Sequence, residues 1–214
     1  MGRESSHEHL HATELRDGTG RNLVFQRIVE GHLLALVTLV SPASELLYAG
    51  AQRADAVFPE PFGVSVRARS VDADGDLVNK AGELLRELGW SGIAELQFIV
   101  SGAGEPHLID LNGRFFGSLG LSEAAGVDLP SAWVESAFGA PVRLPRATTG
   151  VRYQWLEGDL RRAAASRTRR AETIAALRFA PGAVHSLWSG SDPAPALRLV
   201  GDLARRAVGK VVSR

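Results

Sequence analysis

Three polar residues, Asp110, Asn112 and Arg114, stand at alternate positions in the segment HLIDLNGRFFGS, directly after apolar residues. Mg²⁺ takes carboxylate and amide oxygens as ligands, often together with phosphate oxygens. Arginine pairs with a phosphate or a carboxylate through its planar guanidinium. Gly113 and Gly117 would let a substrate come close to the backbone, because glycine has no side chain. The segment therefore predicts a magnesium site beside a phosphate.

A second interpretation of the same segment involves no ligand. Asn112-Gly113 is also the strongest short signal for a tight hairpin turn. In addition, polar residues are normal on the solvent face of an antiparallel sheet. From the local pattern alone, a polar surface turn and a binding site stay equally open.

The elements that position these residues are two strands, predicted over 91–100 and 107–111 with the loop SGAGEP between them. If this loop closes a hairpin, Val100 opposes His107. Because paired antiparallel strands run in opposite directions, each step back along the first strand is then a step forward along the second. This rule places each polar residue of the second strand opposite a residue of the first.

Under this pairing Gln97 faces Asp110, Glu95 faces Asn112, and all four side chains share one face of the sheet. The opposite face carries apolar residues that belong in the core, namely Leu96, Phe98, Ile109 and Leu111. A slip by one residue would bury the polar set, so the apolar face determines the register. The hairpin predicts a cluster of oxygen ligands on its open face.

The preceding half of the chain predicts more strands and one longer helix. Apolar and β-branched residues predict strands over 22–30, 32–40, 45–52 and 63–71. Residues 55–63 predict a loop because they hold Pro59, Pro61 and Gly63. The helix is predicted over 76–88, and its apolar face consists of Leu77, Val78, Ala81, Leu84, Leu85 and Leu88.

Helix ends are marked by capping residues. Asp72 or Asp74 is suited to cap the helix over 76–88, and Gly89 is suited to stop it. Two short helices are predicted near 118–125 and 131–138, the second introduced by Asp128 and Pro130. Runs of strands with separate helices indicate an α+β fold, an antiparallel sheet with packed helices.

Composition limits the classes of partner. Lys plus Arg and Asp plus Glu number 24 each, so charge gives no bias toward nucleic acid or an anionic membrane. The chain has no cysteine, which excludes disulfides and thiolate metal sites and fits a reducing cytoplasm. No apolar run has membrane-spanning length. We therefore expect a cytoplasmic protein without a nucleic-acid or membrane partner.

The polar residues 1–21 are predicted to be a poorly ordered lead-in. His7, His9 and His11 stand at alternate positions in this segment and would suit zinc if they faced one side of a strand. No carboxylate cluster supports them, so a solvated tail is favoured over a zinc site.

A longer pattern surrounds the polar residues. A strand with Gln97 is followed by a loop and a second strand with Asp110-x-Asn112-x-Arg114. An aromatic residue, Gly117-Ser118, a helix and the segment GVDLP come next. From about Asn22 to Phe138, order and spacing resemble the C-terminal catalytic lobe of the ATP-grasp family. The chain is most similar to the branch of carbamoyl-phosphate-synthase-like domains and predicted carboxylate–amine ligases.

The resemblance implies roles for the polar residues. Gln97, Asp110 and Asn112 would hold one or two Mg²⁺ (or Mn²⁺) ions that bridge the phosphates of ATP. Arg114 would steady the transferred phosphoryl group or an acyl phosphate. The chain departs from the family in two ways: Asp110 is one methylene shorter than the usual Glu, and Gln97 lowers the negative charge of the site. Glu95, on the same face, would compensate as a further metal ligand.

The resemblance also implies a nucleotide pocket. The segment LVFQRIVEG resembles the family's hinge strand, so Gln26, Arg27, Ile28 and Val29 would line the adenine pocket and Glu30 would contact the ribose. The segment AQRADAVFPEPFGVSV resembles the basic strand and the Gly-x-Ser loop of the family. Arg53 in this segment would contact a phosphate or substrate; an ordinary edge-strand arginine is the equal alternative.

An ATP-grasp fold holds its nucleotide between two lobes, and the other lobe supplies a glycine-rich loop and a phosphate-binding lysine. Nothing before Asn22 matches that lobe, and neither Lys80 nor Lys210 is placed for the role. We therefore expect one lobe of two: a truncated product, a start-site error, half of a two-chain enzyme, or a remnant reused for binding. A separate chain or a homodimer partner would supply the missing lobe.

Two functions follow from the resemblance. The first is the ATP- and magnesium-binding catalytic lobe of a ligase. Such an enzyme activates a small-molecule carboxylate as an acyl phosphate and joins it to an amine. The alternative is a non-catalytic binding or dimerisation module derived from such an enzyme.

The predicted domain organisation is a lead-in over 1–21, the ATP-grasp lobe over 22–145 and an extension over 146–214. In the extension, a strand into a helix is predicted over 150–160, and 196–212 predicts an amphipathic helix. The region 159–179 is rich in arginine, with Arg161, Arg162, Arg167, Arg169 and Arg170. A solvated or partner-facing helix is favoured there over an RNA-binding one, because no aromatic residues are interleaved.

Overall fold

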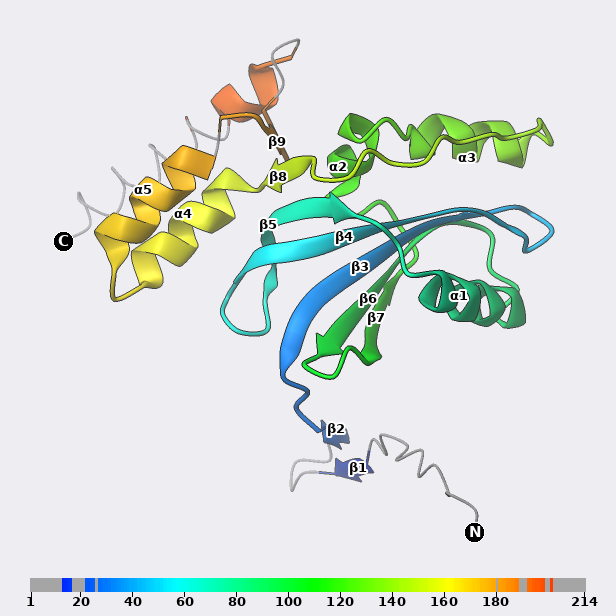
Figure 1. Ribbon diagram of the computed structural model, residues 1–214, viewed down its shortest axis with the longest axis horizontal. Coiled ribbons are helices and arrows are strands. Elements are labelled where there is room, and N and C mark those ends of the chain that lie inside the picture. Colours follow the sequence, from blue (N-terminus) through cyan, green and yellow to red (C-terminus); the bar gives the residue numbers. More distant parts are fainter. Residues whose placement is uncertain are drawn as a thin grey trace.

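The computed structural model describes residues 13–16, 22–25, 27–179, 181–188, 192–198 and 201, and for the first two ranges only the backbone. A seven-stranded sheet with the strand order β7-β6-β3-β4-β5-β8-β9 is the centre of the fold (Figure 1). Its strands are β3 (Gly31–Val40), β4 (Leu46–Phe58), β5 (Val64–Val71), β6 (Gly92–Ser101), β7 (Pro106–Asn112), β8 (Arg152–Gln154) and β9 (Ala183–His185). All neighbours pair antiparallel except β8 and β9. This confirms the predicted α+β fold.

A second, two-stranded sheet lies near the N-terminus, below the large sheet in Figure 1. It pairs β1 (Thr13–Arg16) antiparallel with β2 (Asn22–Phe25). Strand β1 therefore lies within the segment that the sequence predicts as a lead-in. The histidines at 7, 9 and 11 lie outside the described residues.

From Ala35 to Val40, strand β3 is buried on both faces. Leu36 and Val40 belong to a core cluster that helix α1 (Gly75–Glu87) completes with Leu77, Ala81 and Leu85. On the other face, Val37 and Leu39 pack with residues of the segment that holds α2 (Leu119–Ala124) and α3 (Leu129–Ala137). Central strands covered on both faces read as continuous apolar runs.

The second face of the sheet is only partly covered. Residues of the α2–α3 segment cover this face at Val37 and Ile93, toward one end of the strands. Toward the other end of the same face, Leu33 and Gln97 line open cavities. The fold therefore leaves a surface free beside the polar hairpin.

Helix α1 confirms its predicted caps. The Asp74 side chain accepts a hydrogen bond from the Leu77 backbone nitrogen at 2.9 Å, as expected for an N-cap. After the helix, Gly89 has a φ of +62°, which glycine adopts without strain. Leu88 was predicted on the buried face but is exposed, because the helix ends at Glu87.

Two predictions of strand extent are wrong. The predicted strand over 22–30 ends at Phe25, and residues 27–30 are irregular before β3 starts at Gly31. The predicted loop over 55–63 is shorter, because β4 continues to Phe58. Pairing with β5, through irregular register near Ala56, keeps those residues in the sheet.

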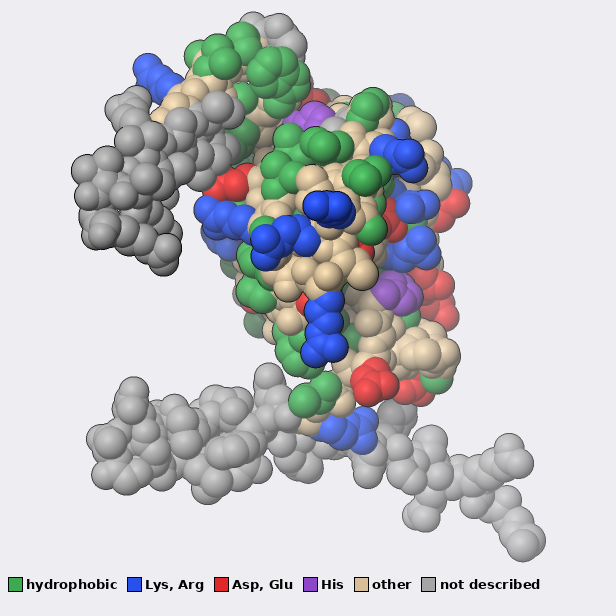
Figure 2. Space-filling view, turned by 90° about the vertical axis from the view of Figure 1, so that its left-hand side faces the viewer, with side chains coloured by type: hydrophobic (Ala, Val, Ile, Leu, Met, Phe, Trp, Pro, Cys, Tyr) green, Lys and Arg blue, Asp and Glu red, His purple; other side chains and the backbone are tan. Residues whose placement is uncertain are grey.

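The region after β8 folds as two helices, α4 (Leu156–Ala165) and α5 (Arg169–Phe179), which lie side by side (Figure 1). The sequence predicts neither this break nor strand β9. Figure 2 looks onto this side of the molecule, where arginine and hydrophobic side chains share the surface. Of the helix predicted over 196–212, residues 196–198 and 201 are described and helical. No helix within the described residues is long and apolar enough to cross a membrane.

A buried carboxylate joins these helices to the sheet. Asp159 on α4 is 0% exposed and accepts hydrogen bonds from Arg67 Nε at 2.6 Å and Gln154 Nε2 at 2.7 Å. Arg162 Nε donates to the same carboxylate at 3.2 Å. A buried charge is stable only when it is paired and hydrogen-bonded, so this contact ties α4 to β5 and β8.

Candidate nucleotide and metal site

The β6–β7 hairpin brings the four predicted polar side chains together. Gln97 pairs with Asp110 and Glu95 pairs with Asn112, as the sequence predicts. On the opposite face Leu96 and Phe98 are buried and Leu111 packs against the same core. The alternation of polar and apolar residues therefore determined the register of this half of the hairpin.

The half of the hairpin nearest the loop differs from the prediction. Val100 pairs with Pro106 instead of His107, because the register shifts between Gln97 and Phe98. Phe98 pairs with Leu108, so Ile109 is an extra residue in β7, as in a β-bulge. Ile109 was predicted in the core but is 54% exposed and lines a cavity.

Hydrogen bonds join the four side chains into one cluster. Gln97 Nε2 donates to Glu95 Oε2 at 3.0 Å, and Asn112 Nδ2 donates to the same oxygen at 3.1 Å. Asn112 Nδ2 also donates to Asp110 Oδ2 at 2.9 Å. The amide nitrogens are thus used within the cluster, and the amide oxygens accept no hydrogen bond from the described residues.

Glu95 is the most deeply buried member, with 5% of its surface exposed. Burial raises the pKa of its carboxyl group, since desolvation disfavours the charged form. The hydrogen bonds from Gln97 and Asn112, and the charge of Arg114, act in the opposite direction. The neighbouring charge of Asp110 adds to the increase.

The cluster lines a cavity of about 510 Å³ together with Arg114. The other walls carry uncharged polar side chains, including Gln52, Ser65, Ser118, Tyr153 and Ser186, and also apolar ones such as Leu33, Phe116 and Trp155. The Tyr153 hydroxyl donates a hydrogen bond to the Gly117 carbonyl at 2.9 Å, and Ser118 Oγ donates one to Gln52 Oε1 at 2.6 Å. This cavity is the polar part of the site.

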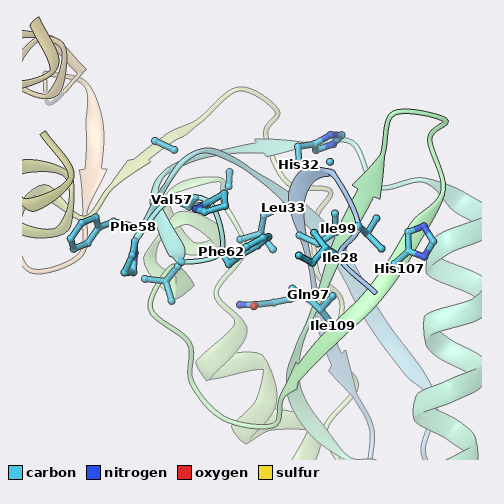
Figure 3. Close-up of a pocket in the computed structure, with 18 of the residues that line it drawn as sticks. Ile28, His32, Leu33, Val57, Phe58, Phe62, Gln97, Ile99, His107 and Ile109 are labelled. Atoms are coloured by element: carbon cyan, nitrogen blue, oxygen red, sulfur yellow. The ribbon is translucent and has the colours of Figure 1, made fainter. Parts of the chain in front are cut away.

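A second cavity of about 940 Å³ is largely apolar (Figure 3). Ile28, Phe62, Ile99 and Ile109 line it, and the Gln97 side chain lies among them. The two cavities share Leu33, Val64, Gln97 and Trp155 as lining residues, so they adjoin. An apolar space therefore leads directly to the polar cluster.

The predicted nucleotide residues are only partly assembled. Arg27, Ile28 and Val29 line the apolar cavity, while Glu30 lines neither cavity. Gln26 lies outside the described residues. Arg53 also lines neither cavity, and its guanidinium lies 3.9 Å from the Asp55 carboxylate.

The predicted glycines have different surroundings. A Cβ on Gly113 would overlap with ring atoms of Trp90, so this glycine admits the close packing of an indole ring. A Cβ on Gly117 would meet nothing within 4 Å. Gly117 lines the polar cavity, as expected of a backbone position that a substrate can approach.

Sequence reasoning missed the residues that the C-terminal extension contributes. Tyr153, Trp155, Ser186 and Leu187 line the polar cavity, and Arg161 lines the apolar one. Tyr153 and Trp155 stand in the segment RYQW, whose two aromatic residues by themselves indicate a buried strand equally well. Within the described residues, no group of three His, Cys, Asp or Glu side chains is placed to hold a metal ion.

A family model described as "ATP-grasp in the biosynthetic pathway with Ter operon" matches residues 63–159, which include Glu95, Gln97, Asp110, Asn112 and Arg114. Over these residues the chain is similar to ATP-grasp domains. The match ends within α4, so α5 and β9 lie outside it. The particular branch of ligases stays a prediction.

Two solved structures share the fold of this chain at low identity. The biotin carboxylase–beta-gamma-ATP complex from Campylobacter jejuni is 13% identical, with a TM-score of 0.51 over 61% of this chain and 31% of that chain. The biotin carboxylase domain of a thermophilic 2-oxoglutarate carboxylase bound to bicarbonate is 16% identical, with a TM-score of 0.50 over 63% and 32%. This chain thus spans about a third of the length of each. No curated protein matches the sequence.

Proposed function

We propose that this chain is the ATP- and magnesium-binding lobe of a ligase that activates a carboxylate and joins it to an amine. The observation that carries the proposal is the position of the Glu95–Gln97–Asp110–Asn112 cluster. All four side chains line the polar cavity together with Arg114, and Gln97 also lines the adjoining apolar cavity.

The apolar cavity suits the base of a nucleotide. Its volume of about 940 Å³ and its aliphatic and aromatic lining are those of small-molecule sites. Backbone groups of residues 27–29 lie at its edge and would hydrogen-bond the adenine. A nucleotide seated there would extend its phosphates past Gln97 into the polar cavity.

The polar cluster fits a hard cation. Asp110 supplies a carboxylate, and Gln97 and Asn112 supply amide oxygens that accept no other hydrogen bond from the described residues. Mg²⁺ is normally held by one or two carboxylates plus the phosphates of its substrate, so a larger acidic group is not needed. When bound, Mg²⁺ would neutralise charge on the phosphates.

The reaction would proceed in two transfers. The γ-phosphoryl group of ATP would move to a carboxylate oxygen of the substrate, which gives ADP and an acyl phosphate. The amine nitrogen would then attack the acyl carbon, phosphate would leave, and an amide would form. Arg114 would bind the phosphoryl oxygens during transfer, since guanidinium pairs well with phosphate.

A phosphate-binding lysine would have to come from outside this lobe. Among the described residues no lysine lines either cavity, and Lys80 lies on α1. Around the cavities on this face of the sheet, large apolar side chains are also exposed, with Ile109 on β7 at 54% and Phe62 in the loop between β4 and β5 at 73%. We therefore propose that a second lobe, on a separate chain or a homodimer partner, closes over this face.

Calorimetric titration of Mg·ATP into the chain tests the proposal. The wild type should bind Mg·ATP more tightly than metal-free ATP, and Asp110→Ala and Asn112→Ala should each abolish that difference or the binding. Glu83→Ala is the matched control, because it removes an exposed carboxylate from α1 on the opposite face of the sheet. It should bind as the wild type does.

The negative outcome is equally specific. A folded wild type that shows neither heat nor a thermal shift with millimolar Mg·ATP would contradict nucleotide binding by this lobe alone. The non-catalytic module would then be the better description of the chain.

A further inference from the structure

Glu95 differs from the other three members of the polar cluster. It is nearly inaccessible, and one of its carboxylate oxygens, Oε2, accepts hydrogen bonds from both amides of the cluster. Gln97 reaches it along the same strand, and Asn112 reaches it across the hairpin. The carboxylate therefore lies beneath the two amides.

These contacts determine which way each amide points. A side-chain amide has an NH₂ group that only donates and an oxygen that only accepts. Because the nitrogens of Gln97 and Asn112 are held on Glu95, their oxygens are turned to the opposite side of each amide group. Both residues line the polar cavity, and their oxygens accept no hydrogen bond from the described residues, which leaves these oxygens for a ligand in that cavity.

The same contacts account for Gln97 as the residue type. Its nitrogen lies 3.0 Å from Glu95 Oε2, and only a donor is stable so close to a carboxylate. A glutamate at position 97 would place two carboxylates against each other beside Asp110. The pair Glu95 and Gln97 keeps one negative charge and still presents an oxygen to the cavity.

We propose that Glu95 is a positioning residue of the metal site. It holds Gln97 and Asn112 with their oxygens toward the cation, and its buried charge strengthens the attraction for the cation. This inference rests on the proposed binding of Mg·ATP. It replaces the expectation that Glu95 is itself a metal ligand.

A positioning role predicts a specific split between two measurements. Without Glu95, the amides lose their anchor, so the affinity for Mg²⁺ in the nucleotide complex should fall by about tenfold or more. Metal-free nucleotide should bind unchanged or more tightly, because a negative charge near its phosphates has been removed. A loss of general stability would weaken both kinds of binding together.

The experiment compares Glu95→Leu, which removes the acceptor at similar volume, with Glu95→Gln, which keeps an acceptor and loses the charge. The affinity for trinitrophenyl-ATP is measured in EDTA and as a function of Mg²⁺. The magnesium midpoint is the Mg²⁺ concentration at which half of the change in nucleotide affinity has occurred. The midpoint of Glu95→Gln should lie between those of the wild type and Glu95→Leu. Glu105→Leu and Glu105→Gln, at an exposed position of the same hairpin, are the matched controls.

A double-mutant cycle separates positioning from direct ligation. If Glu95 acts through Gln97, then Gln97→Ala and Glu95→Leu should together lose less magnesium affinity than the product of the two single losses. Strictly multiplicative losses would overturn the positioning role. Equal weakening of binding in EDTA and in Mg²⁺ would overturn it as well.

The proposed function fails in a different way. It is contradicted if the wild type shows no magnesium-dependent nucleotide binding at all. Wild-type binding that depends on magnesium, together with a Glu95→Leu variant whose magnesium midpoint is unchanged, would reject this inference and leave the proposed function standing.

Discussion

Arg162 Nη1 lies 3.3 Å from Glu60 Oε1, and this ion pair joins helix α4 to the loop between β4 and β5. The same guanidinium contacts Glu172 on α5 at 2.6 Å and the buried Asp159. Pro59, Pro61 and Phe62 of the loop line the apolar cavity. Helices α4 and α5 are thus connected to the wall of the proposed nucleotide site.

Replacing the buried carboxylate of this network should destabilise the fold. Asp159→Asn leaves the charges of Arg67 and Arg162 without their shared partner, and breaking a buried ion pair costs about 3 kcal/mol. Urea unfolding followed by circular dichroism would measure the loss. Asp192→Asn, an exposed control, should change the free energy of unfolding by less than about 0.5 kcal/mol. Equal stability of Asp159→Asn and the wild type would show that the network is dispensable.

Phe62 should contribute to nucleotide affinity without contributing to stability. It lines the apolar cavity yet is 73% exposed, so it has little to bury until a ligand is present. We expect Phe62→Ala to weaken Mg·ATP binding by about tenfold, from the apolar area no longer covered. Phe138→Ala is the matched control, since Phe138 is 87% exposed at the end of α3 and lines neither cavity. Isothermal titration of both variants checks this, and equal affinities would argue against a base in the apolar cavity.

Arg114 should discriminate between nucleotides by their terminal phosphate. It lines the polar cavity, and its guanidinium is exposed apart from a hydrogen bond to the Phe115 carbonyl at 3.0 Å. Arg114→Ala should therefore lower the affinity for ATP by about tenfold and the affinity for ADP much less. Only ATP carries the terminal phosphate with which Arg114 would pair. Competition of each nucleotide with a fluorescent analogue gives the ratio.

Arg53 offers a matched arginine outside both cavities. Arg53→Ala should leave the ATP to ADP ratio and both affinities unchanged. A tenfold loss in that variant would instead support the phosphate contact implied by the resemblance to the family.

Gly113 should be intolerant of a side chain. In Gly113→Ala, the new methyl group overlaps with the Trp90 ring, and relieving such an overlap costs about 1–3 kcal/mol. Gly117→Ala meets open space and should leave the melting temperature unchanged. Thermal unfolding of the two variants makes the comparison. A stable Gly113→Ala would mean that Trp90 moves aside easily.

The sequence alone predicted the polar cluster because its cause is local. Alternation along one hairpin puts Glu95, Gln97, Asp110 and Asn112 on one face, and burial of Leu96 and Phe98 on the other face prevents a slip. The caps of α1 were predicted for the same reason, since Asp74 and Gly89 act within one turn of the helix. The resemblance to ATP-grasp proteins was likewise carried by the order of such local patterns.

Only the tertiary structure decided what surrounds the cluster. The bulge at Ile109, the approach of Phe62 to Ile28 in one cavity, and the place of Tyr153 and Ser186 in the other depend on contacts between distant segments. It also left Arg53 outside both cavities, although the resemblance to the family implied a phosphate or substrate contact for it. Periodicity states which face a residue occupies within its own element. Which elements meet is determined by how the whole apolar surface is buried, and no short pattern records that.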